Sequence, residues 1–310
     1  MAIDVVLSGD RRVLWGLAVT VYSALEASSG GLNIYVLATA FTEKDKDDLR
    51  KSWTHRNCEK VEFLEIPESL LKDFRSTKYL KSKSAYSRYF IGLLPASISR
   101  CVYLDTDLLV FKDLTQIAKL DFGTNILAAV RDVSVRTRPS WPELCERLGL
   151  KSESSYFNSG FLIVDLDAWR RESIEQKLIR VSVEKFDQLD SQDQDALNIV
   201  FEDRTLYLDV AWNISQYERP KSLDNHIVHL IGSIKPWHAR YAAKFEIPYF
   251  QNTIYDTFYR FLDKTAYRGL RPLTLGGLGA VIENLKAGWP TRDMFIGKIR
   301  RTVAKLQRAN

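Results

Sequence analysis

Short apolar runs alternate with amphipathic segments along the first part of the chain. The apolar runs have the length and composition of buried strands and span residues 3–7, 32–39 and 61–66. Between them, apolar residues recur at helical spacing over 13–25, and Thr42 with Asp45 indicates the start of a polar helix that ends near residue 56. This order of elements predicts an open, largely parallel α/β sheet with helices on its faces.

The alternation continues through the middle of the chain. We expect a helix over 82–93, a strand within 100–111, a strand over 125–130, a strand over 161–165 followed by a long helix, a helix over 191–201 and a strand ending near His229. Residues 133–155 are polar and carry Pro139, Trp141 and Pro142, so we expect them to form an excursion or lid rather than part of the sheet.

Two aspartates interrupt the apolar run of residues 100–111. Asp105 and Asp107 stand where the buried strand should end, and side chains two residues apart on an extended segment project to the same side. Both could therefore reach one hard cation, such as a divalent metal bound to a diphosphate. A strand that ends in an Asx-type turn, with both carboxylates solvated, is the alternative that the local pattern leaves open.

Two later segments carry further candidate chemistry. Gln192-Asp193-Gln194-Asp195 opens a predicted helix, where acidic side chains also serve as ordinary capping groups. The segment 226–238 contains His229, Gly232 and Lys235, and the glycine permits a tight turn between the histidine and the lysine. A single histidine is more often a core residue than a ligand, but the adjacent turn and lysine favour a ligand here.

The character of the chain changes after about residue 247. Residues 249–268 are aromatic and basic, and the segment after Asp293 has no acidic side chain but an amphipathic pattern with five cations. We therefore expect a main domain over residues 1–247 and a helical C-terminal extension over residues 248–310. The tail of this extension suits an anionic membrane surface, with an ordinary surface helix as the alternative.

Composition and charge narrow the class of protein. The 310 residues are 45% hydrophobic and 27% charged, which is typical of a globular protein, and the net charge of +5 suits an anionic ligand but not a nucleic-acid binder. Cys58, Cys101 and Cys145 lack metal-ligand spacing, which favours a reducing compartment. No signal peptide and no uncharged apolar segment of ~20 residues is evident, so we expect a cytoplasmic protein, with the tail at the inner face of the membrane.

Five motifs occur in the order typical of one enzyme family. They are Tyr86-Ser87-Arg88, Tyr103-Leu104-Asp105-Thr106-Asp107, Tyr156-Phe157-Asn158-Ser159-Gly160, Gln192-Asp193-Gln194-Asp195 and the segment 229–238. On these motifs, residues 3–240 resemble the family 8 retaining glycosyltransferases, particularly bacterial enzymes that transfer galactose or glucose from a UDP-sugar to lipopolysaccharide and related glycans. The resemblance implies a GT-A catalytic domain over residues 1–247, with a mostly parallel nucleotide-binding sheet flanked by helices.

The resemblance also assigns roles to individual residues. Asp105, Asp107 and His229 correspond to ligands of Mn²⁺, with Mg²⁺ as the alternative ion. The expected donor-binding residues are Ser8 and Asp10 at the uridine, Gly232 and Lys235 at the diphosphate, and Thr106 and Arg88. The residues expected around the transferred sugar are Arg88, Asp132, Asn158, Asp193 and Gln194. The expected partners are UDP-galactose or UDP-glucose and a glycan or lipid-linked acceptor.

The reaction explains why such a set is needed. Breaking a sugar–phosphate bond leaves negative charge on UDP, which a metal ion and Lys235 would stabilise. Gln194 would be a poor nucleophile because an amide oxygen lacks the charge of a carboxylate. We therefore favour attack from the leaving-group face, with a diphosphate oxygen taking the proton of the acceptor, and keep Asp193 as the competing nucleophile.

One segment departs from the family pattern. After Asp10 the family usually has an acidic residue, Asn and a Tyr that stacks on uracil, whereas this chain has Arg11-Arg12-Val13, which brings positive charge to the nucleotide. The departure keeps open a second hypothesis, a nucleotide-sugar-binding protein without transfer activity. A nucleotidyltransferase would need a glycine-rich basic phosphate loop, and Ser8-Gly9-Asp10 is too sparse for one.

Overall fold

The computed structural model describes residues 2–75, 83–132, 135, 139–151, 156–218, 220–232, 235–237 and 249–271. The strands of the large sheet are β1 (Ile3–Asp10), β2 (Leu32–Thr39), β3 (Cys58–Glu65), β4 (Arg100–Leu104), β6 (Leu127–Arg131), β7 (Phe157–Asp165) and β8 (Thr205–Tyr207). A small sheet contains β5 (Leu108–Val110), β9 (Ile214–Ser215) and β10 (Ile227–His229).

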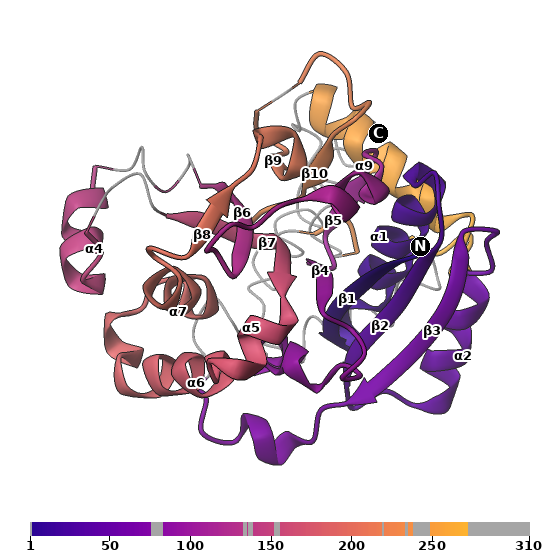
Figure 1. The fold of residues 1–310 in the computed structure, drawn as a ribbon. Coiled ribbons are helices and arrows are strands. Elements are labelled where there is room, and N and C mark those ends of the chain that lie inside the picture. The colour runs from indigo at the N-terminus through magenta and orange to yellow at the C-terminus, as the bar shows by residue number, and fades with distance from the viewer. Residues whose placement is uncertain are drawn as a thin grey trace, which may run out of the picture.

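Helices surround these sheets. The α-helices are α1 (Leu14–Ala27), α2 (Glu43–Ser52), α4 (Trp141–Leu148), α5 (Leu166–Arg171), α6 (Ile174–Glu184), α7 (Gln192–Val200) and α9 (Tyr249–Leu262). The 3₁₀ helices are η1 (Arg11–Val13), η2 (Glu68–Leu71), η3 (Lys83–Leu93), η4 (Leu114–Lys119), η6 (Phe186–Gln188) and η7 (Val210–Trp212). In Figure 1, α1 and α9 lie side by side, while α5, α6 and α7 gather beside the other half of the sheet.

The large sheet is mixed but mostly parallel, as the sequence predicts. Its strand order is β3-β2-β1-β4-β7-β6-β8, and only β7 runs antiparallel to its neighbours, β4 and β6. Alternate residues of β1 face opposite sides, so that Val5 and Leu7 join the core under α1, whereas Val6 joins the core under η3. Two apolar layers therefore cover the sheet, as expected for a doubly covered α/β domain.

Several local predictions need correction. The predicted helix over 82–93 is the 3₁₀ helix η3, with a kink at Phe90. The strand predicted from residue 161 begins at Phe157, because it continues as the antiparallel partner of β6. The predicted long helix after it is two helices, α5 and α6, separated where Ser173 adopts a left-handed backbone conformation (φ 53°). The capping box of Thr42 and Asp45 is confirmed at the start of α2.

The aromatic segment after residue 247 contributes to the main core. Ile254, Phe258 and Leu262 of α9 are buried in the layer that contains α1, and Trp237 packs against Phe258 with ring centroids 5.7 Å apart. The division of the chain at residue 247 stays a prediction. The predicted amphipathic tail lies outside the described residues. Of the segment 133–155, residues 135 and 139–151 are described, and they contain α4 and no strand of the sheet. Among the helices that are described, none is long and apolar enough to cross a membrane.

Candidate active site

The chain leaves the large sheet at Asp105 and enters the small sheet at Leu108. There β5 pairs with β10 in antiparallel register, and His229 stands opposite Leu108. This register brings the imidazole beside the two aspartates: Nε2 of His229 lies 3.2 Å from Oδ1 of Asp107 and 3.9 Å from Oδ2 of Asp105. One ligand atom from each of the three residues lies within 4.8 Å of the others. The sequence prediction that these three residues converge is confirmed.

The orientation of His229 fits a metal ligand. Its Nδ1 faces the side-chain oxygens of Asn158 and Asn213, each at 3.1 Å, so Nδ1 is the donor and Nε2 is directed toward the carboxylates. Gly160 permits this placement, because a Cβ there would lie 2.2 Å from Cε1 of His229. Two carboxylates and an imidazole nitrogen are a donor set that suits Mn²⁺ better than Ca²⁺ or Mg²⁺, which prefer oxygen ligands.

Two cations compensate the negative charge of the aspartates. Lys235 forms an ion pair with Asp107 and also donates to the carbonyl of Leu230 at 2.6 Å. Burial alone would raise the pKa of Asp107, but the charge of Lys235 and the interaction with His229 outweigh it and hold this pKa well below its usual range. Asp105 instead accepts from Nη2 of Arg88 at 2.7 Å. Each aspartate is therefore paired with one cation, Asp107 with Lys235 and Asp105 with Arg88.

Arg88 links the metal side of the site to α7. Its Nε lies 3.1 Å from Oδ2 of Asp193, and its Nη1 donates to the carbonyl and hydroxyl oxygens of Ser159 at 3.0 and 2.9 Å. Burial raises the pKa of Asp193 to about 6, against the opposing effect of Arg88. Asp193 is thus a carboxylate whose charge changes with pH near neutrality. Arg88 contacts both Asp193 and Asp105, so the two carboxylates lie beside the same guanidinium group.

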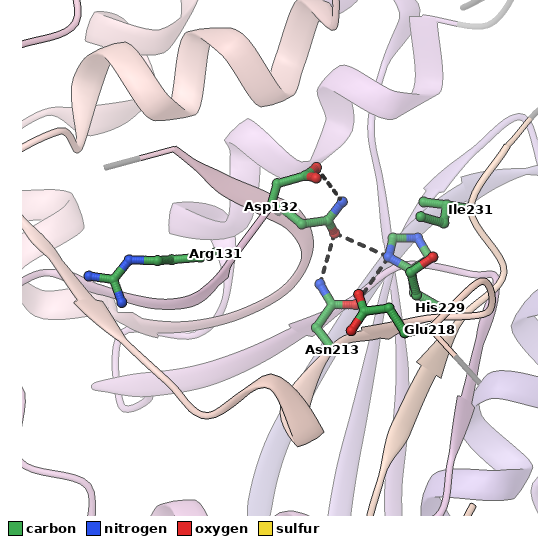
Figure 2. A pocket seen from close by; sticks show the side chains of 8 residues that line it. Arg131, Asp132, Asn213, Glu218, His229 and Ile231 are labelled. Atoms are coloured by element: carbon green, nitrogen blue, oxygen red, sulfur yellow. Dashed lines mark hydrogen bonds between the residues drawn. The ribbon is translucent and has the colours of Figure 1, made fainter. Parts of the chain in front are cut away.

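A third group of polar residues lies around Gln194. Its Nε2 donates to Asp132 at 3.2 Å, and its Oε1 accepts from the backbone N–H of Ser159 at 3.1 Å. Asp132 also accepts from Nδ2 of Asn158 at 3.4 Å. Asp132 and Asn158 line an open pocket together with His229, Asn213, Glu218, Arg131, Ser215 and Ile231. Figure 2 shows Arg131 pointing away from this group.

The remaining predicted residues lie at or just beyond the ends of β1, β4 and β10. The hydroxyls of Ser8 and Tyr103 are 3.0 Å apart, and Tyr103 donates to Asp105 at 3.0 Å, which links Ser8 to the aspartates. Thr106 packs its backbone against α1, where a Cβ at Gly16 would lie 2.3 Å from its carbonyl oxygen. Gly232 has a φ of 105°, which confirms the predicted glycine turn. Asp10 contacts Arg12 and the hydroxyl of Ser84.

Comparison with known proteins identifies the family. The family described as glycosyl transferase family 8 matches residues 4–240, which is more than half of the chain. The chain belongs to glycosyl transferase family 8. Its fold is that of GT-A glycosyltransferases: it matches the galactosyltransferase LgtC in complex with donor and acceptor sugar analogues with a TM-score of 0.70 and 23% identity, covering 85% of this chain and 96% of that one.

Several named proteins are similar to this chain in sequence. General stress protein A of Bacillus subtilis is 28% identical over 264 residues, which cover 79% of this chain and 89% of that protein. The lipopolysaccharide 1,3-galactosyltransferase of Salmonella typhimurium is 26% identical over 246 residues, which cover 74% of this chain and 71% of that protein. The lipopolysaccharide glucosyltransferase WaaO of Escherichia coli is 23% identical over 257 residues, which cover 77% and 73% respectively.

The structure adds residues to this family 8 site that the sequence predictions omit. Asn213 orients His229, and no local pattern around residue 213 indicates such a role. Tyr103 and Ser159 lie within two of the family motifs. Tyr103 stands two residues before Asp105 on an extended segment, and this spacing predicts that the two side chains lie on the same side. Glu218 lines the pocket from the loop after β9, where neither periodicity nor a motif marks it.

Proposed function

We propose that this family 8 protein transfers a hexose, galactose or glucose, from a UDP-sugar to a glycan or lipid-linked acceptor, with retention of configuration and dependence on Mn²⁺. The observation that carries the proposal is the convergence of Asp105, Asp107 and His229, with Lys235 paired to the second aspartate. Relatives named as lipopolysaccharide galactosyl- and glucosyltransferases support the choice of hexose and of acceptor class.

The three converging side chains would hold the cation, and the cation would supply Lewis-acid stabilisation of the departing diphosphate. Lys235 would provide a second positive charge on the leaving-group side. Its ammonium group, which pairs with Asp107, would donate a hydrogen bond to a phosphate oxygen. Because this charge stabilises UDP directly, no protein acid has to protonate the leaving group. Glycoside hydrolases, in contrast, use a carboxylic acid for that purpose.

The residues of α7 and β7 would orient the transferred sugar. Asp193 is held by Arg88, and Gln194 is held by Asp132 and Ser159, so neither group is a freely rotating side chain. The oxygen of Gln194 already accepts the N–H of Ser159, which weakens it further as a nucleophile. These contacts support attack from the leaving-group face. The bond between the anomeric carbon and the diphosphate oxygen breaks, UDP leaves, the acceptor oxygen bonds to the anomeric carbon, and the proton of the acceptor hydroxyl passes to an oxygen of the departing diphosphate.

Donor hydrolysis tests this proposal. The protein is incubated with UDP-galactose or UDP-glucose in the presence of Mn²⁺, Mg²⁺ or a chelator, and released UDP is measured together with the anomer of the released sugar by NMR. We expect metal-stimulated UDP release and a sugar of retained configuration. Asp107→Asn should lower the release by about 100-fold or more, because one ligand charge is lost.

Asp47→Asn, a matched change on the exposed surface of α2, should leave release unchanged. Absence of metal-stimulated release from every nucleotide sugar tested would refute the transferase proposal.

The sequence of the tail supports a location for this activity. Residues after Asp293 carry five cations and no acidic side chain, in an amphipathic pattern. We propose that this segment makes peripheral contact with an anionic leaflet, the inner face of the cytoplasmic membrane, where a lipid-linked acceptor would be available.

A further inference from the structure

The end of β1 occupies a distinctive place in the large sheet. The strand order reverses there, with β2 and β3 on one side of β1 and β4 on the other. Crevices at such switch points, beyond the carboxyl ends of parallel strands, are the usual ligand sites of open α/β sheets. β4 ends just before Asp105, and Ser8 near the end of β1 is joined to Asp105 through the hydroxyl of Tyr103.

Asp10 and Arg12 lie within reach of a ligand held near Asp105. Asp10, the last residue of β1, lies two residues beyond Ser8, which corresponds to roughly 7 Å along an extended strand. A nucleoside diphosphate that lies across the end of β1 would meet the side chains of these two residues.

Asp10 and Arg12 form a tightly connected pair at this point. Nη2 of Arg12 lies 2.6 Å from Oδ2 of Asp10, and Nε of Arg12 lies 3.2 Å from both carboxylate oxygens. The carboxylate also accepts from the backbone N–H of Arg12 at 2.9 Å and from the hydroxyl of Ser84 at 3.0 Å. Both oxygens of Asp10 are thus engaged, and the carboxylate acts as a support for the guanidinium.

The pair leaves about half of the Arg12 side chain exposed to solvent. The contacts with Asp10 use the Nε–Nη2 edge of the group, which is planar, and the Arg12 side chain is 49% exposed whereas the Asp10 side chain is 14% exposed. A planar cation fixed along one edge is a suitable surface for an aromatic ring, because guanidinium groups stack on aromatic faces.

We propose that the Asp10–Arg12 pair is the platform on which the nucleobase of the donor stacks. The inference rests on the proposed function, since it requires a nucleotide diphosphate at the aspartates. Asp10 then contributes by positioning Arg12, in place of accepting a ribose hydroxyl. Because every base has a π face, such a platform favours nucleotides over free diphosphate but discriminates weakly among bases.

Binding of UDP and of inorganic pyrophosphate, each with Mn²⁺, tests the platform by isothermal titration calorimetry. Arg12→Ala should weaken UDP binding by about 5- to 30-fold and change pyrophosphate binding by less than about twofold. Arg12→Lys should weaken UDP binding almost as much, because it keeps the charge but loses the plane. Arg12→Tyr should restore UDP affinity to within about threefold, because it replaces one stacking surface by another.

Arg50→Ala provides the matched control. Arg50 is an arginine of similar exposure, but it lies on α2, where its Nη1 pairs with Asp47 at 2.9 Å, so its removal should leave both affinities unchanged. An Arg12→Ala variant with unchanged UDP affinity would overturn the platform, and so would an Arg12→Lys variant that binds UDP like the parent. If the parent protein bound pyrophosphate and UDP equally, the platform would also fail, while metal-stimulated donor hydrolysis would leave the proposed function intact. A parent protein that bound neither probe would refute both.

Discussion

Gln194 connects two elements of the site through a single amide group. It donates to Asp132, which follows β6, and accepts from Ser159 in β7. We expect Gln194→Ala to slow hexose transfer by about 10- to 100-fold, because Asp132 and the sugar-facing end of β7 lose a common support, while UDP binding stays within about twofold. Single-turnover transfer rates and calorimetric UDP binding measure the two effects separately.

Gln188→Ala is the control for this change, because Gln188 is an exposed glutamine outside the site. Full turnover in the Gln194→Ala variant would show that Gln194 does not support the reacting sugar.

Asp193 couples the stability of the protein to pH. Burial raises its pKa from 3.8 to about 6 although Arg88 is adjacent. Because the folded value lies above the unfolded one, the contribution of this group favours folding below about pH 4 and is lost as the pH rises through 6. We expect Asp193→Asn to be more stable than the parent above pH 7, by about 1–3 kcal/mol, and to be deficient in transfer.

Urea denaturation of the metal-free proteins between pH 4 and 8 measures this difference. Asp45→Asn gives a comparison of opposite sign. Burial would raise the pKa of Asp45, but hydrogen bonds from Thr42 and Arg11 lower it, so its loss should destabilise the protein at pH 7. If the free energy of unfolding varied with pH in the same way in the parent and in Asp193→Asn, the raised pKa of Asp193 would be contradicted.

At the scale of elements, the order of strands and helices in the first hundred residues could be predicted, but the change of sheet could not. Residues 100–111 look like one apolar run, yet β4 belongs to the large sheet and β5 pairs with β10 more than a hundred residues later. Long-range pairing of three-residue strands leaves no periodic signal in a single sequence. Motifs therefore predict the two aspartates and the imidazole, whereas no motif marks Asn213, which orients the imidazole.

Gly160 tests how this pairing builds the site. It lies in β7, and an alanine Cβ at this position would be 2.2 Å from Cε1 and 2.6 Å from Nδ1 of His229. We expect Gly160→Ala to displace the imidazole and to weaken Mn²⁺ binding by about tenfold or more, with the sheet retained. Calorimetric titration with Mn²⁺ and far-UV circular dichroism measure the two quantities.

Gly92→Ala is the matched variant, because an added Cβ there meets Trp169 only at 3.4 Å, an ordinary contact distance. Unchanged Mn²⁺ affinity in Gly160→Ala would mean that His229 is not constrained by β7.

At the scale of the whole molecule, the segment after residue 247 contains α9 and a basic tail after Asp293, and their compositions have different explanations. α9 contributes Ile254, Phe258 and Leu262 to the core shared with α1, so its aromatic composition is explained by packing. Core packing does not explain the five cations after Asp293, because charged side chains are rarely buried without partners. Each cation near an anionic leaflet contributes about 1 kcal/mol, so five give reversible attachment that weakens with salt.

We therefore expect a variant that lacks residues 293–310 to sediment less with vesicles of anionic phospholipid while it releases UDP from the donor at the parental rate. A full-length variant with Lys298, Arg300, Arg301, Lys305 and Arg308 all replaced by Gln should show the same loss, because the attraction depends on charge. Vesicles of neutral phospholipid control for attachment by the apolar face alone. Equal sedimentation of the parent and both variants with anionic vesicles would contradict membrane contact through the tail, and a parallel loss of donor hydrolysis would instead assign these residues to the catalytic domain.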